Sequence, residues 1–259
     1  MARVRLDSLL TERGLFASRT RAAAAVLAGQ VHLGPGRARA AKPGQLVADD
    51  VEVAVDAPPP YVSRGGVKLA NALDALGVGV AGRRALDVGA STGGFTDCLL
   101  QRGAEHVVAL DVAYGELDWT LRGDERVTVI ERVNARALEP GVLPYAPDLI
   151  VIDVSFISLT KVLPAVLGCA AERFDCLAMV KPQFELGRGR VGKGGVVRDP
   201  ALRREAVASV AEGARSLGAA VMGFAPSGLP GPAGNRETFV WLAEGERGGA
   251  AVDLDEVDV

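Results

Sequence analysis

The feature that most constrains the fold is an alternation, from residue 61 onward, of short apolar segments with longer amphipathic segments. Near-continuous apolar segments are typical of strands buried on both faces, and intervening helices favour parallel pairing. Expected strands cover 85–88, 106–112, 127–131, 149–154, 176–180, 219–224 and 238–242. Expected helices cover 67–76, 94–102, 158–170 and 199–217. The pattern predicts an α/β, Rossmann-like fold with a seven-stranded, mainly parallel sheet whose last two strands form an antiparallel hairpin.

The first 56 residues have a different pattern and predict a small, separate α+β domain. Two short helices are expected there, the second capped by Ser18 and ended by Gly29, together with short strands. A proline run at 58–60 indicates a stiff linker, assigned to 57–64. The main domain is then expected over 65–244, and an acidic, disordered tail over 245–259.

The charge of the chain is unevenly distributed, although the net charge is only −3. Residues 1–40 hold seven arginines against two acidic residues, whereas residues 244–259 hold six acidic residues against one arginine. A basic segment of this kind favours a polyanionic partner such as a nucleic acid. The small first domain is therefore the part of the chain expected to contact a polyanionic partner.

Several classes of protein are disfavoured by what the sequence lacks. No apolar run approaches the ~18 residues that a membrane-spanning helix needs, and the first residues lack the apolar core of a signal peptide. The three cysteines, Cys98, Cys169 and Cys176, do not have the spacing of metal ligands. We therefore expect a cytoplasmic protein with no membrane partner and no metal, whose cysteines lie in the core.

A glycine-rich turn follows the first expected strand of the main domain and indicates a nucleotide-like cofactor. Its pattern, D-x-G-x-x-x-G-G, starts at Asp87 and favours S-adenosylmethionine over a dinucleotide, although a tight structural turn is the simpler alternative. Asp111 ends the second strand, where a carboxylate accepts hydrogen bonds from ribose hydroxyls. The expected cofactor-binding residues are Asp87, Gly89, Ala90, Ser91, Thr92, Gly93, Gly94, Phe95, Asp111, Asn134 and Asp153.

Two further charged residues end apolar strands. Asp153 ends the apolar run 149–152 within the strand expected over 149–154, and Lys181 ends the run 177–180. The carboxyl ends of parallel strands share the edge of the sheet where ligands bind, so these two side chains are expected near Asp111. Taken singly, Asp153 could be a helix cap and Lys181 a solvated strand end. Together they predict a site with a carboxylate and an amine.

Motifs spread along the chain resemble those of the TlyA-type ribosomal-RNA 2′-O-methyltransferases, a family also called haemolysins. The resemblance extends from about Arg5 to Leu242. The matching segments are Arg5-Leu6-Asp7, Ser18-Arg19, Tyr61-Val62-Ser63-Arg64-Gly65-Gly66, 89–95, Asp153-Val154-Ser155-Phe156-Ile157-Ser158-Leu159, Lys181-Pro182-Gln183-Phe184-Glu185 and Gly231-Pro232-Ala233-Gly234-Asn235. The family combines an RNA-binding domain like that of ribosomal protein S four with an FtsJ-like methyltransferase domain.

The resemblance implies an activity and a set of functional residues. Methyl transfer from S-adenosylmethionine to cytidine ribose in 16S or 23S ribosomal RNA, within ribosomal subunits, is the implied reaction. The Lys-Asp-Lys-Glu catalytic tetrad of the family falls on Lys68, Asp153, Lys181 and Glu237. Arg3, Arg5, Arg19, Arg21 and Arg64 are the implied RNA-binding residues. The acidic tail after Leu242 departs from members that continue with a further helix, which leaves the methylated subunit open.

Three other functions remain as alternatives. A base-directed methyltransferase would place Asn/Asp-Pro-Pro-Tyr/Phe after the fourth strand, whereas this chain has Asp-Val-Ser-Phe at 153–156. A haemolysin-like, membrane-active protein would need a secretion signal or a lipid-facing amphipathic helix. A non-catalytic RNA-binding protein would account for the basic segment and leave the tetrad without a use.

Overall fold

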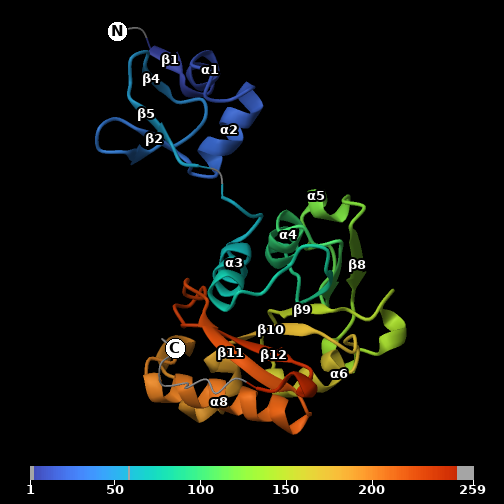
Figure 1. Ribbon diagram of the computed structural model, residues 1–259. Helices are drawn as coiled ribbons and strands as arrows, with labels where there is room; N and C mark the ends of the chain where they lie inside the picture. Colours follow the sequence, from blue (N-terminus) through green and yellow to red (C-terminus); the bar gives the residue numbers. More distant parts are fainter. Residues whose placement is uncertain (1–2, 58, 250–259) are drawn as a thin grey trace. The chain divides into compact units, whose positions relative to one another are not determined.

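The computed structural model describes residues 3–57 and 59–249, and the chain separates into two compact units, residues 1–59 and 60–259. In the first unit, α1 (Leu6–Glu12) and α2 (Arg19–Leu27) accompany two small antiparallel sheets (Figure 1). One sheet pairs β1 (Arg3–Arg5) with β4 (Leu46–Ala48), and the other has the order β3 (Ala38–Arg39), β2 (Val31–Leu33), β5 (Val53–Val55). As expected, the Ser18 hydroxyl caps α2 by accepting a hydrogen bond from the Arg21 amide.

The second unit is built on a seven-stranded sheet with the order β11-β12-β10-β9-β6-β7-β8. The strands are β6 (Arg84–Val88), β7 (His106–Asp111), β8 (Val127–Glu131), β9 (Leu149–Ile152), β10 (Asp175–Val180), β11 (Ala220–Pro226) and β12 (Thr238–Ala243). The pairs among β10, β9, β6, β7 and β8 are parallel, and β12 runs antiparallel to both β10 and β11. The predicted Rossmann-like α/β class and the predicted hairpin are therefore confirmed.

Helices cover both faces of this sheet. They are α3 (Arg64–Leu76), α4 (Gly94–Gln101), α5 (Trp119–Arg122), α6 (Leu163–Leu167), α7 (Pro182–Glu185) and α8 (Pro200–Ser216). Figure 1 shows α3 and α4 on one side of the sheet and α8 on the other. Successive strand residues serve opposite faces: Ile150 and Ile152 pack in the core with α6 and α8, whereas Val151 packs with α3 and α4. Cys98, Cys169 and Cys176 are buried, as expected.

Three local expectations differ from the structure. The helix expected over 158–170 is instead a 3₁₀ turn, Leu159–Lys161, followed by the short α6, because Pro164 is tolerated only in the first turn of a helix. The linker expected over 57–64 ends earlier, since Arg64 is the first residue of α3. The tail is not disordered from residue 245: Gly245–Arg247 form a 3₁₀ turn anchored by an ion pair between Arg247 and Asp175. The rest of that prediction, 250–259, lies outside the described residues.

Candidate functional site

Strand topology brings charged residues from distant parts of the chain to one edge of the sheet. Asp153 and Lys181 follow the parallel strands β9 and β10, so both lie at the carboxyl edge. Because β12 is antiparallel to β10, its first residue, Thr238, pairs with Val180, and Glu237 lies at the same edge. Lys68 reaches this edge from α3, where it is buried. The sheet and one helix therefore assemble the predicted tetrad.

The four side chains form two ion pairs. Lys68 pairs with Glu237, and both side chains are buried, with exposed fractions of 9% and 2%. Lys181 Nζ lies 2.5 Å from Asp153 Oδ1 and donates a hydrogen bond of 2.8 Å to Ser155 Oγ. Ionised groups that are buried are costly unless they are paired, so the pairing explains how two lysines fit within one site. Each amine is held in a fixed direction by an acidic partner.

The tetrad lines a cavity of about 410 Å³, which we call the Lys181 cavity. Besides the tetrad, it is lined by Ser63, Arg64, Gly65, Gly89, Ala90, Ser91, Thr92, Gly94, Phe95, Ser155 and Pro232. Much of the predicted glycine-rich turn therefore faces the tetrad. Once it has released its own proton, an amine held between oxygen acceptors at the wall of an open cavity can accept a proton from a hydroxyl group placed there.

Glycine at the turn is required by close contact between two loops. A Cβ on Gly89 would lie 2.5 Å from the Asp153 carbonyl oxygen, and Gly89 has a φ of +87°. The next loop is fixed through Asp111, whose carboxylate accepts hydrogen bonds of 2.8 Å from the amides of Ser91 and Ala113. The Ser91 hydroxyl donates to Glu116 Oε2 at 3.0 Å. Asp111 thus holds the loop after β6 next to the loop after β7.

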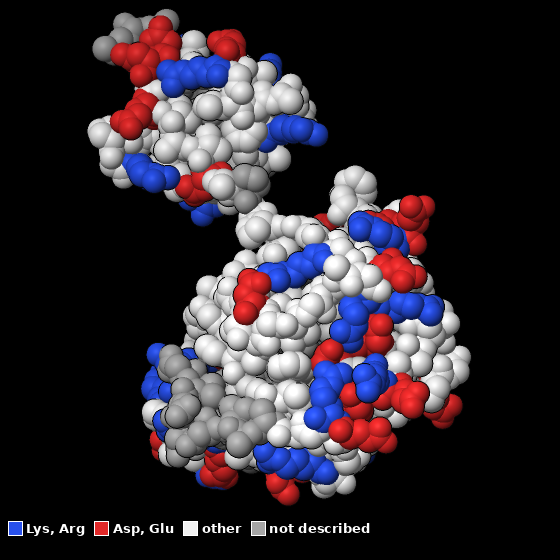
Figure 2. Space-filling view, viewed as in Figure 1, with Lys and Arg blue, Asp and Glu red and all other residues white. Residues whose placement is uncertain are grey.

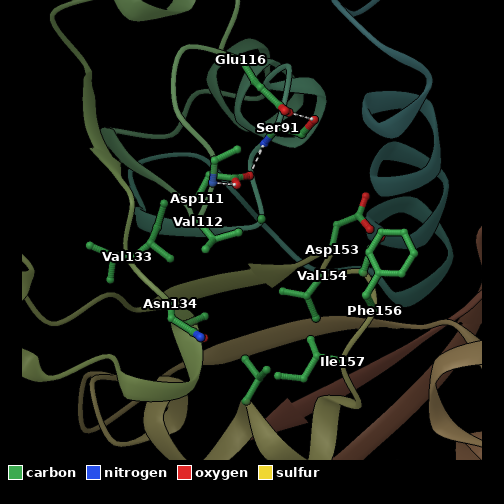
Figure 3. Close-up of a pocket in the computed structure, with 16 residues that line it drawn as sticks. Ser91, Asp111, Val112, Glu116, Val133, Asn134, Asp153, Val154, Phe156 and Ile157 are labelled. Carbon is green, nitrogen blue, oxygen red and sulfur yellow. Dashed lines mark hydrogen bonds between the residues drawn. The ribbon is translucent and has the colours of Figure 1, made fainter.

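Beside the Lys181 cavity lies a second one of about 470 Å³, which we call the Asp111 cavity (Figure 3). Figure 3 shows Asp111, Glu116 and Asn134 on one side of it and Asp153 with Phe156 on another. The two cavities share Gly89, Ser91, Asp153 and Ser155. The apolar wall of the Asp111 cavity includes Val112, Val133, Val154 and Ile157.

The residues around the Asp111 cavity fit an adenosine group. Apolar side chains can cover both faces of an adenine ring, and the Asp111 carboxylate can accept hydrogen bonds from ribose hydroxyls. Asn134 lines the cavity, and its Oδ1 accepts a hydrogen bond of 3.0 Å from the Arg136 amide. The shared wall places such a group directly beside the tetrad.

Asp87 is fully buried, with an exposed fraction of 0%, and does not line either cavity. Its Oδ2 accepts a hydrogen bond of 2.7 Å from the Thr96 hydroxyl, and its Oδ1 is buried without a hydrogen-bond partner. Burial raises the pKa of Asp87 to about 7 despite the Thr96 bond, and the nearby Asp153 and Asp111 charges add to the rise. Asp87 therefore anchors the first turn of α4, which follows the glycine-rich turn.

We expect the replacement Asp87→Asn to change how stability depends on pH. The native pKa is raised from 3.8 to about 7, so the native state binds the proton more tightly than the unfolded chain. Proton binding by Asp87 stabilises the native state by up to about 4 kcal/mol. This contribution is complete below pH 3.8 and is lost as the pH rises through 7. In urea denaturation, Asp87→Asn should gain stability relative to wild type between pH 4.5 and 7. A difference that stays constant across this range would contradict the assignment.

Of the basic residues predicted to bind RNA, Arg64 lines the Lys181 cavity and donates a hydrogen bond of 2.8 Å to the Pro230 carbonyl oxygen. Arg3, Arg5, Arg19 and Arg21 belong to the first unit. Arg5 and Arg19 both contact Asp7, and the Arg5 hydrogen bonds hold the pKa of that carboxyl far below its usual range. Figure 2 shows basic and acidic side chains interspersed on the visible face of both units.

Arg5 and Arg19 nevertheless keep more than half of their side-chain surface exposed, at 52% and 57%. A phosphate group can therefore reach both guanidinium groups while Asp7 holds them in place.

Sequence reasoning missed Ser155 as a site residue, although it lies only two positions after Asp153. Trp119 lies outside both cavities and is 81% exposed.

Comparisons with known proteins agree with this geometry. The family model described as FtsJ-like methyltransferase matches residues 61–244. The 16S/23S rRNA (cytidine-2′-O)-methyltransferase TlyA of Mycobacterium tuberculosis is 52% identical, over 93% of this chain and 90% of the relative. The rRNA methyltransferase candidate YqxC of Bacillus subtilis is 43% identical, over 94% of this chain and 88% of its own length.

A solved structure shows the same likeness in three dimensions. A hemolysin candidate from Streptococcus thermophilus superposes with a TM-score of 0.74 at 38% identity, and the match covers 97% of this chain and 92% of that one. No helix among residues 3–57 and 59–249 is long and apolar enough to cross a membrane. Within the same residues, no group of three or more His, Cys, Asp or Glu side chains could hold a metal ion.

Proposed function

The chain belongs to the FtsJ-like family of S-adenosylmethionine-dependent methyltransferases, within its TlyA group, and we propose that it methylates the 2′-hydroxyl of cytidine ribose in ribosomal RNA. The observation that carries the proposal is the convergence of Lys68, Asp153, Lys181 and Glu237 on one cavity wall. That wall adjoins a cavity whose lining fits adenosine. The relatives from Mycobacterium tuberculosis and Bacillus subtilis are rRNA methyltransferases by name, and the tetrad supplies the matching chemistry.

A ribose hydroxyl is a poor nucleophile until its proton is removed. Neutral Lys181 is positioned to accept that proton, and Asp153, 2.5 Å away, stabilises the ammonium that results. S-adenosylmethionine, when bound, supplies a methyl group on a positively charged sulfur. The O–H bond would break toward Lys181 as the oxygen bonds to the methyl carbon, while the methyl–sulfur bond breaks and leaves its electron pair on a neutral thioether. Lys68, fixed by Glu237, contributes positive charge beside the oxygen.

The first unit is proposed to hold the RNA. Its exposed arginines can contact phosphate groups, and such contacts position a nucleic acid without reading its sequence. Ribosomal RNA within ribosomal subunits is the proposed partner, and the cytoplasm, where ribosomes are assembled, is the proposed location. The segment after β9 lacks the two prolines of base-directed enzymes, which favours ribose as the acceptor.

The experiment that tests the proposal is methyl transfer from labelled S-adenosylmethionine to separated ribosomal subunits, followed by alkaline hydrolysis. A 2′-O-methyl group blocks cleavage at its own linkage, so labelled dinucleotides resistant to alkali are the expected product. Labelled mononucleotides would instead indicate methylation of a base. Lysis of erythrocytes by the purified protein, without labelled RNA, would favour the activity that the hemolysin name of a relative suggests.

We expect Asp111→Ala to weaken S-adenosylmethionine binding by at least about 100-fold. Two hydrogen bonds from ribose hydroxyls to a charged acceptor are lost, each worth roughly 1.5–3 kcal/mol. The same change frees the amides of Ser91 and Ala113. Isothermal calorimetry measures the effect, and Asp124→Ala, in a turn outside both cavities, is the control. Equal affinities of Asp111→Ala and wild type would show that the ribose lies elsewhere.

A further inference from the structure

The amine of Lys181 has a partner outside the tetrad. Among the described residues, the hydrogen bond that Lys181 Nζ makes is the one of 2.8 Å to Ser155 Oγ. Asp153 Oδ1 lies 2.5 Å from Nζ and forms an ion pair with it. The direction of the amine is therefore set by a serine hydroxyl as well as by a carboxylate. Ser155 lines both the Lys181 cavity and the Asp111 cavity.

We propose that Ser155 is a positioning residue that directs the lone pair of neutral Lys181 toward the substrate hydroxyl. A neutral amine has two N–H groups and one lone pair. With Ser155 Oγ and Asp153 Oδ1 on two sides of Nζ, the N–H groups face these oxygens and the lone pair takes the third direction. Without Ser155, the amine can rotate about its Cε–Nζ bond, and the lone pair is aimed correctly for only part of the time.

A ring contact and two hydrogen bonds link the segment that carries Ser155 to the helix that follows Lys181. Phe156 has a φ of +64°, a strained conformation that persists only where surrounding contacts enforce it. Its ring packs on Phe184 of α7, with centroids 5.1 Å apart. Glu185, also in α7, accepts hydrogen bonds from the Ser158 hydroxyl at 2.6 Å and the Leu159 amide at 2.9 Å.

These contacts join the loop after β9 to the helix that directly follows Lys181. The hydroxyl of Ser155 is thereby placed in advance of substrate binding, as catalysis by positioning requires. The charged groups that share the Lys181 cavity are Arg64, Lys68, Asp153 and Glu237, so Ser155 supplies an uncharged acceptor among them. An uncharged acceptor can orient the amine in both of its protonation states.

The inference rests on the proposed function, because it assumes that Lys181 accepts the proton. It is tested with Ser155→Ala and Ser155→Thr in the full chain, with ribosomal subunits as substrate. We expect Ser155→Ala to lower kcat about tenfold with KM for RNA unchanged within about twofold, since only the reacting geometry is lost. Ser155→Thr keeps the hydroxyl and should retain at least about half of the wild-type kcat. Ser216→Ala, in exposed α8 surface, is the matched control.

The pH profile of kcat distinguishes positioning of Lys181 from a purely structural role. Ser155 stabilises the ammonium by accepting its hydrogen bond, so Ser155→Ala favours the neutral amine. The acid limb of the profile should therefore move to lower pH. Wild-type kcat and an unshifted acid limb in Ser155→Ala would overturn the inference, as would a change confined to KM. If wild type itself makes no alkali-resistant product, the proposed function fails instead.

Discussion

Replacement of Lys181 by alanine is expected to lower methyl transfer by about 10²–10⁴-fold, the range that a positioned acid or base contributes. The reason is that Lys181 is proposed to act on the acceptor hydroxyl. S-adenosylmethionine binding should stay within about threefold of wild type, because Lys181 lines the Lys181 cavity and not the Asp111 cavity. Single-turnover transfer of labelled methyl groups and calorimetric titration with the cofactor measure the two effects separately.

A matched control for this prediction is Lys161→Ala. Lys161 is an exposed residue of a 3₁₀ turn and lines neither cavity, so its loss should leave turnover unchanged. Lys181→Ala leaves the Asp153 carboxylate without its cation, and an unpaired charge can destabilise the fold. Folding of the variant is therefore checked by thermal denaturation. Turnover above about a tenth of wild type in a folded Lys181→Ala protein would remove Lys181 as the essential base.

The sequence alone predicts the sheet well because each buried strand is a short apolar run with a clear start and end. All seven expected strands of the second unit occur, displaced by at most a few residues. Helices are predicted less well where local chemistry opposes the period, as at Pro164, which divides the expected helix 158–170. The short α5 and α7 have too few residues to show a helical period.

The candidate site is only partly contained in the local sequence. Asp153 and Lys181 could be placed on one edge because strand ends are visible in the pattern. The pairing of Lys68 with Glu237 spans 169 residues, and it came from family resemblance, since no local signal connects the two positions. The roles of Asp87 and Ser155 depend on which way each side chain points within a loop or strand. Asp87 faces Thr96, away from both cavities.

Removal of residues 1–59 is expected to abolish efficient methylation of ribosomal RNA while leaving a folded domain that binds S-adenosylmethionine. The second unit has its own two-sided core, and every residue of the tetrad and of both cavities belongs to it. What the deletion removes is the set of exposed arginines proposed to hold phosphate groups. Turnover on ribosomal subunits at low RNA concentration should fall at least about 100-fold, because phosphate contacts dominate nucleic-acid affinity.

The salt dependence of RNA binding tests the cause of that loss. Each phosphate contact adds about 0.7–0.9 to the slope of log K against log salt, so four arginines should account for a slope difference of about 3. The full chain should therefore lose affinity steeply with salt, and residues 60–259 should show a much shallower dependence. Calorimetry with S-adenosylmethionine confirms that the shortened protein is folded. If both proteins bind RNA with the same affinity and slope, the RNA-holding surface lies in the second unit.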